Sequence, residues 1–94
     1  MDNIKPFIDE HGKITQMPVP LKKRLTVLAY MAEKFEPDKK YSEKEVNRII
    51  QDWHTFNDYF IVRRLLVDHG FLGRCADGTL YWVLQPEDRV GRNG

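Results

Sequence analysis

The chain has 94 residues, 41% of them hydrophobic and 31% charged, which excludes a disordered segment and favours one globular domain. Its single cysteine, Cys75, excludes an intramolecular disulfide, and no apolar stretch approaches the roughly 20 residues of a membrane span. A net charge of +1 argues against sequence-independent binding to nucleic acid. With no signal-peptide pattern, we expect a cytoplasmic protein with one domain over 1–94, a core at about 7–84, and frayed ends at 1–6 and 86–94.

The N-terminal third predicts a short β-hairpin followed by a helix. The hairpin is expected at residues 7–16, with its turn at Gly12, which can adopt a positive φ. Apolar residues at helical spacing then predict a first helix over 20–35, which Pro37 ends. The expected apolar stripe consists of Leu21, Leu25, Leu28, Met31, Ala32 and Phe35.

The second predicted helix has the clearest start signal in the chain. Ser42 and Glu45 have the spacing of a capping box, in which each side chain satisfies the main-chain amide of the other residue. Tyr41 before this cap and Val46 after it are placed to form a hydrophobic staple. The buried face of the helix is expected to consist of Val46, Ile49, Ile50 and Trp53.

A third helix is predicted over residues 55–69. Thr55, with Asp58 three residues later, gives a weaker version of the same cap. Gly70 is the expected left-handed residue at the end of the helix, in a Schellman motif. The buried side is expected to hold Tyr59, Val62, Leu65 and Leu66.

A second hairpin is predicted over residues 71–83, turning at Asp77-Gly78, a dipeptide that favours a two-residue type I′ turn. This register places Arg74 opposite Tyr81. The short connection between the second and third helices is typical of a helix-turn-helix, and a two-stranded wing follows directly. The order of elements therefore predicts an α+β winged helix-turn-helix fold.

One combination of motifs spans most of the chain. It includes the run Tyr-Ser-Glu-Lys-Glu-Val-Asn at 41–47, with further stretches at 20–25, 63–68, 70–74 and 77–82, and Asp58. Over residues 12–83 this combination resembles a bacterial family of unknown function, whose members occur alone or fused behind winged-helix regulators of the arsenic-repressor type. The resemblance implies a helix-turn-helix-like fold and a link to transcriptional regulation. It implies no catalytic residue, cofactor or ligand.

The outward side of the predicted third helix carries two candidate base-reading residues. Asn57 and Arg64 lie away from its apolar side, and their side chains pair with adenine and guanine in bidentate fashion. The alternative for Arg64 is an ion pair with Asp68 one turn later. The leading hypothesis is a transcriptional regulator that binds duplex DNA with residues 55–69 as its reading helix.

Five further cations are candidate phosphate contacts: Lys22, Lys23, Arg24, Arg63 and Arg74. The three basic residues at 22–24 crowd a helix start, where an anion would relieve their unfavourable interaction with the helix dipole. The alternative is a solvated basic face. For Arg63 the alternative is a neighbouring acid, and for Arg74 a stack on Tyr81.

Phe60 and Val67 share the outward side of the third helix, where a helix that contacts DNA is ordinarily polar. An outward apolar strip favours a partner helix, a dimer interface or cover from the N-terminal hairpin. The alternative hypothesis is therefore an interaction or dimerisation module, with a second copy or a regulator protein as its partner and no membrane contact.

The sequence contains no motif that is typical of catalysis or of metal binding. The chain lacks a glycine-rich phosphate loop, a nucleophile elbow and paired catalytic carboxylates. The spacings of His11, His54, His69 and Cys75 fit no structural zinc site. We therefore expect that the protein is not an enzyme and that it binds no cofactor or metal ion. A small-molecule sensor is a third hypothesis, for which the sequence indicates no ligand.

Overall fold

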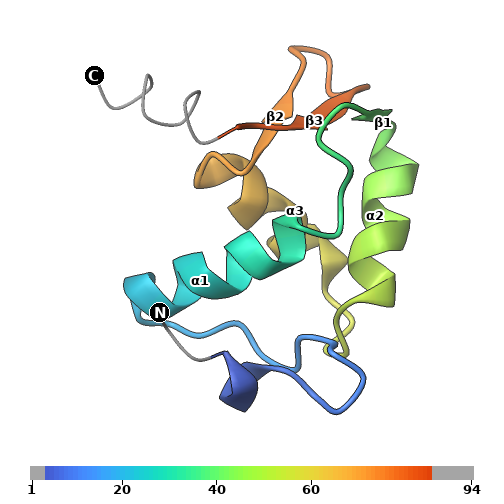
Figure 1. Ribbon diagram of the computed structural model, residues 1–94. Helices are drawn as coiled ribbons and strands as arrows, with labels where there is room; N and C mark the ends of the chain where they lie inside the picture. Colours follow the sequence, from blue (N-terminus) through green and yellow to red (C-terminus); the bar gives the residue numbers. More distant parts are fainter. Residues whose placement is uncertain (1–3, 86–94) are drawn as a thin grey trace.

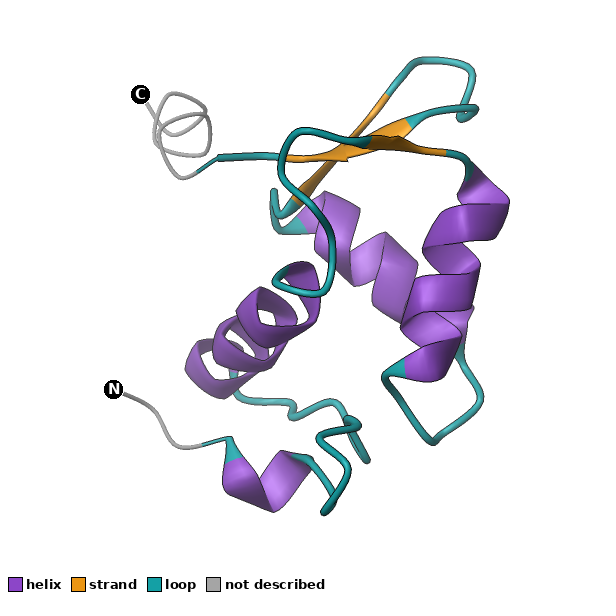
Figure 2. Ribbon diagram, turned by 45° about the vertical axis from the view of Figure 1, so that its right-hand side comes forward, coloured by secondary structure: helices purple, strands orange, loops and turns teal. Residues whose placement is uncertain are grey.

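The structure, a computed structural model, describes residues 4–85. Its three helices and three-stranded antiparallel sheet make an α+β fold compatible with a winged helix, as predicted (Figure 1). The sheet has the strand order β1-β3-β2 and lies at one end of the helices (Figure 2). The elements in chain order are the 3-10 helix η1 (Lys5–Phe7), α1 (Leu21–Ala32), β1 (Lys40–Tyr41), α2 (Glu43–Asp52), α3 (Tyr59–Asp68), β2 (Leu72–Arg74) and β3 (Tyr81–Val83).

The N-terminal segment pairs as the sequence predicts, in a short hairpin: Asp9 N–H donates to Lys13 O (2.8 Å), and Thr15 N–H donates to Phe7 O (2.8 Å). Ile8 and Ile14 form one isolated antiparallel bridge, around a turn in which Gly12 has φ +78°. The main-chain groups of Ile14 itself bond to the connection between α2 and α3: its N–H donates to Trp53 O (2.8 Å), and its O accepts from Thr55 N–H (2.9 Å). Because Ile14 is fully buried, this pairing anchors the N-terminal segment. Residues 1–6 were expected to fray, but Lys5 and Pro6 belong to η1.

Helix α1 is shorter than predicted, and its buried face is shifted. The main chain tightens after Ala32 into bonds between residues three apart, from Phe35 N–H to Ala32 O (3.1 Å), so that Phe35 is buried in the following turn. Leu21 is 59% exposed, and the expectation that it joins the core is wrong. Leu21 is the first residue of α1. The buried residues of α1 are Val27, Leu28, Met31 and Ala32.

The start of α2 confirms the predicted capping box. Ser42 N–H donates to Glu45 Oε1 (2.8 Å), and Glu45 N–H donates to Ser42 Oγ (3.2 Å). The two residues before this cap form strand β1, which the sequence did not predict. Tyr41 pairs with Tyr81 of β3 and is buried, as is Val46 on the other side of the cap.

Helix α3 begins at Tyr59, four residues later than predicted. Asp58 is its N-cap and accepts a hydrogen bond from Ile61 N–H (3.2 Å). Asn57 has φ +55°, a left-handed conformation that no α-helix can contain. Asn57 therefore lies in the connection before α3, and its expected place on a reading helix that starts at Thr55 is wrong.

A buried histidine holds the connection between α2 and α3. His54 Nδ1 donates to Ile50 O (2.6 Å), and its Nε2 accepts from Asp58 N–H (2.9 Å). These two contacts require the neutral tautomer with its proton on Nδ1. The ring also packs edge-on against Phe56. His54 thus links the last turn of α2 to the N-cap of α3.

The end of α3 is the predicted Schellman motif. Gly70 has φ +80°, Phe71 N–H donates to Leu66 O (2.8 Å), and Gly70 N–H donates to Val67 O (3.1 Å). The wing, strands β2 and β3, follows with the predicted register, in which Arg74 lies opposite Tyr81.

The turn of the wing is not type I′. A type I′ turn needs positive φ at two successive residues, whereas only Gly78 has it (φ +74°) in this turn. The closing bond runs instead from Gly78 N–H to Cys75 O (3.0 Å). The side chain of Asp77 stabilises this different turn by accepting from Thr79 N–H (3.0 Å).

Candidate interaction surface on α3 and the wing

The outward side of α3 is uncovered in the described part of the chain. Phe60 is 53% exposed and Ile61 is 37% exposed, and both are large apolar side chains. Arg64 and Asp68 follow on the same side, whereas Val67 is half-buried against the core. We define the α3 face as Phe60, Ile61, Arg64 and Asp68. The N-terminal segment, which was one candidate cover for this side, pairs with residues 53–55 instead.

The charges of the α3 face are paired with each other. Arg64 Nε lies 3.8 Å from Asp68 Oδ2, one turn along the helix, and both side chains are more than half exposed. An exposed pair of this kind contributes little to stability. It does neutralise the one outward arginine of α3, as the alternative interpretation of Arg64 expected.

Arg63 points toward α2 and lies inside the domain. Its Nη1 donates to Asn47 Oδ1, and its Nη2 lies 3.8 Å from Glu43 Oε1. The Arg63 side chain is only 13% exposed, and its guanidinium also lies 5.1 Å from the centre of the Phe60 ring. Tyr81 OH donates to the same Glu43 oxygen (3.3 Å). These polar contacts join α2, α3 and the wing, so that Arg63 has a structural role.

The remaining candidate cations are not gathered on α3. Lys22 and Lys23 are exposed in the first turn of α1, and Arg24 beside them donates from Nε to Pro18 O (3.0 Å). Arg74 is exposed on β2. Figure 1 shows the start of α1 and the tip of the wing at well-separated places on the molecule. The sequence-predicted DNA contacts therefore form no single basic surface.

The tip of the wing carries the carboxylate of Asp77, whose pKa is lowered by hydrogen bonds. Asp77 Oδ1 accepts from Cys75 Sγ (2.8 Å), Thr79 Oγ1 (2.7 Å) and Thr79 N–H (3.0 Å). These hydrogen bonds, that from Cys75 first, lower the pKa of Asp77 to about 2. A negative charge at this position repels phosphate.

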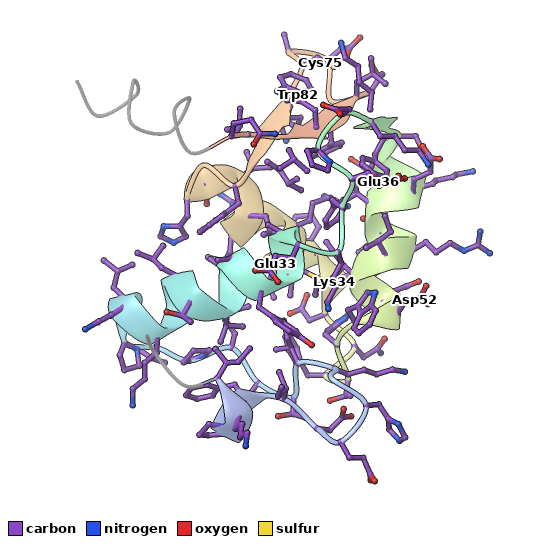
Figure 3. The ribbon with its side chains drawn as sticks, in the orientation of Figure 1. Glu33, Lys34, Glu36, Asp52, Cys75 and Trp82 are labelled. Atoms are coloured by element: carbon purple, nitrogen blue, oxygen red, sulfur yellow. The ribbon has the colours of Figure 1, made fainter. Side chains whose placement is uncertain are left out.

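The outer face of the wing holds a tryptophan that the sequence analysis did not single out. Trp82 of β3 lies opposite Gly73 of β2, and a Cβ on Gly73 would come within 2.4 Å of the indole. Lys40 of β1 lies on the same face, with its Nζ 5.9 Å from the ring centre. Figure 3 shows Trp82 on the sheet and Cys75 near the wing tip. A glycine opposite a tryptophan in the predicted hairpin is the sequence signal that could have indicated this close packing.

Two further observations concern metal ligands and membrane-spanning helices in the described residues. Among residues 4–85, no three side chains of His, Cys, Asp or Glu lie together as a metal site requires. Within the same range, no helix has the length and apolar character needed to cross a membrane.

The fold and this surface define a small α+β domain with a winged-helix-compatible arrangement and an exposed, electrically neutral helix face. Residues 13–83 match the model of DUF2087, a family described as an uncharacterized protein conserved in bacteria, and the chain belongs to this bacterial family. No curated protein and no solved structure matches the chain.

Proposed function

We propose that this chain is a winged-helix interaction domain that docks onto a second copy of itself through the α3 face. The observation that carries the proposal is the exposure of Phe60 and Ile61 at the start of α3. Neighbouring large apolar side chains on a surface mark contact sites more often than single exposed ones do. In this proposal the domain acts in the cytoplasm, without catalysis or a cofactor.

The charge pattern of the α3 face favours a second copy as the occupant. Arg64 and Asp68 lie one turn apart on the exposed side of the helix. Two copies of α3 that pack antiparallel about a two-fold axis place Arg64 of each copy opposite Asp68 of the other. The interface then contains two symmetry-related pairs of opposite charge. In the same register Phe60 lies just past the C-terminal end of the other copy's α3, which ends at Asp68.

The resemblance to domains fused behind arsenic-repressor-type regulators supports a regulatory setting. A domain that pairs with its own copy would bring together two subunits of such a regulator. The polar contacts of Arg63 support this role, because they hold α3 against α2 and leave the α3 face outward.

Size-exclusion chromatography with light scattering tests the proposal. We expect the 11.2-kDa chain to run at twice that mass, and Phe60→Glu to return it to the monomer. Leu21→Glu is the matched control, because Leu21 is similarly exposed but lies on α1. A wild-type chain that is monomeric at millimolar concentration would overturn the proposal. It would also be overturned if Phe60→Glu and Leu21→Glu changed the measured mass equally. Far-UV circular dichroism verifies that both variants are folded.

Binding of duplex DNA is a second candidate function, favoured by the winged-helix-compatible topology and by the exposed cations Lys22, Lys23 and Arg74. In this case α3 would be the reading helix. The exposed charged side chains of residues 58–83 are less favourable: Arg64 and Arg74 (+2) are set against Asp58, Asp68 and Asp77 (−3), a net −1. The geometry therefore supports this function less well than it supports self-association.

Fluorescence anisotropy with a mixed pool of duplex DNA tests this second function. Saturable binding that weakens steeply as salt rises would support it, and Arg74→Ala should then reduce both the affinity and the salt dependence. The absence of binding to the pool at low salt would exclude it.

A further inference from the structure

A groove of about 390 Å³ lies between the end of α1 and the base of the wing. Its walls are mainly apolar, and its size is within the range of small-molecule sites. Ala29 and Ala32 of α1 form one side, and Phe71 and Leu84, at the two ends of the wing hairpin, form another. Leu84 N–H donates to Phe71 O (3.0 Å), so that this second wall is held by the sheet.

Glu33 is the charged residue of the groove lining. Its neighbour Lys34 is held elsewhere, with its Nζ 4.0 Å from the ring centre of Trp53 and 4.3 Å from that of Tyr30. Among residues 4–85, no cation forms an ion pair with Glu33. The groove therefore combines a mainly apolar surface with one carboxylate, that of Glu33, at its edge.

We propose that this groove binds a small organic cation, an ammonium group carried on an aromatic or branched aliphatic body. The apolar walls take up the body of the ligand, and the Glu33 carboxylate accepts a charge-assisted hydrogen bond from the ammonium group. This site is separate from the α3 face and does not depend on the function proposed for that face.

The position of the groove gives such a ligand a structural consequence. One wall belongs to α1, and the other contains the residues that enter and leave the wing, Phe71 and Leu84. A bound ligand therefore contacts both parts at once and fixes the wing relative to α1. Because the ligand binds only the folded chain, it also stabilises the domain.

Titration of the ¹⁵N-labelled chain with 2-phenylethylammonium, and separately with the neutral 2-phenylethanol, tests the proposal. We expect saturable amide shifts confined to residues 29–37, 71 and 83–85. The cation should bind about tenfold more tightly than the alcohol, equivalent to about 1.4 kcal/mol. Three results would each overturn the proposal: equal affinities for the two probes, shifts spread over the whole chain, or no saturation at 10 mM. A Kd of 10 mM corresponds to a binding free energy of about 2.7 kcal/mol at 25 °C.

Two variants locate the charge that is responsible. Glu33→Gln should reduce the affinity for the cation to that for the alcohol and leave the alcohol unaffected. Glu10→Gln, an exposed carboxylate in the N-terminal turn, is the matched control and should change neither affinity. Unchanged binding of the cation to Glu33→Gln would contradict the assignment even if the groove is occupied.

Discussion

The Arg63 guanidinium on α3 is hydrogen-bonded to the Asn47 amide oxygen on α2. Glu43, which accepts a hydrogen bond from the Tyr81 hydroxyl, lies next to the same guanidinium and extends the contact to the wing. An arginine that the sequence offers as a phosphate contact thus fixes the relative position of two helices and a sheet. The neighbouring Arg64 points the other way, into solvent.

Arg63→Met should lower the free energy of unfolding by about 1–3 kcal/mol, because it leaves the Asn47 amide without its hydrogen-bond donor in a partly buried site. Arg64→Ala is the matched control on the same helix. Its exposed pair with Asp68 predicts a change within about 0.5 kcal/mol. Urea denaturation measures both, and equal losses of stability would show that Arg63 does not have the structural role described above.

Gly73→Ala should displace the indole of Trp82. An added Cβ would come within 2.4 Å of the ring, and overpacking of this kind costs about 1–3 kcal/mol. We expect a lower stability together with a shift of the Trp82 indole N–H resonance. An unchanged indole resonance would be incompatible with the packing of Trp82 on Gly73.

Ser42→Ala should cost about 1 kcal/mol of stability, because the Glu45 amide loses its acceptor at the start of α2. The pKa of Glu45, which hydrogen bonds from Ser42 lower, should at the same time rise, although the main-chain donor remains. Chemical denaturation and an NMR titration of the Glu45 carboxyl group measure the two effects. A stability equal to that of the wild type would contradict the role of the cap.

Asp77 should titrate with a pKa of about 2, against an ordinary value of 3.8. Since the folded-state pKa is the lower one, its hydrogen bonds stabilise the wing fully above about pH 4, and this contribution is lost as the pH falls toward 2. Thr79→Val removes the hydroxyl donor and should move the pKa upward. A midpoint near 3.8 in the wild-type NMR titration would refute the hydrogen-bonded turn.

The features predicted correctly from the sequence are local ones. The Ser42 and Glu45 cap, the Gly70 stop and the register between Arg74 and Tyr81 each depend on residues close together in the chain, whose conformational preferences act with little help from the rest of the fold. The exposure of Phe60 also followed from its position on one helix.

The features that the sequence could not predict depend on contacts between distant segments. Arg63 and Asn47 are 16 positions apart, and Tyr81 and Glu43 are 38 apart. The pairing of Ile14 with the connection between α2 and α3 is of the same kind. The error at Asn57 has a local cause. Few residues other than glycine adopt a positive φ, and the apolar spacing of a helix does not show that Asn57 does so.

The central claim is that two copies meet through the α3 face, with Arg64 of each copy opposite Asp68 of the other, and a charge-swap experiment tests it most directly. Arg64→Asp alone would place two acids against each other in the symmetric dimer, and Asp68→Arg alone would place two arginines together. We therefore predict that each variant is monomeric in sedimentation equilibrium, whereas an equimolar mixture forms a heterodimer, in which both cross-pairs are again of opposite charge. A mixture that stays monomeric, or single variants that dimerise as the wild type does, would contradict the proposed use of the α3 face.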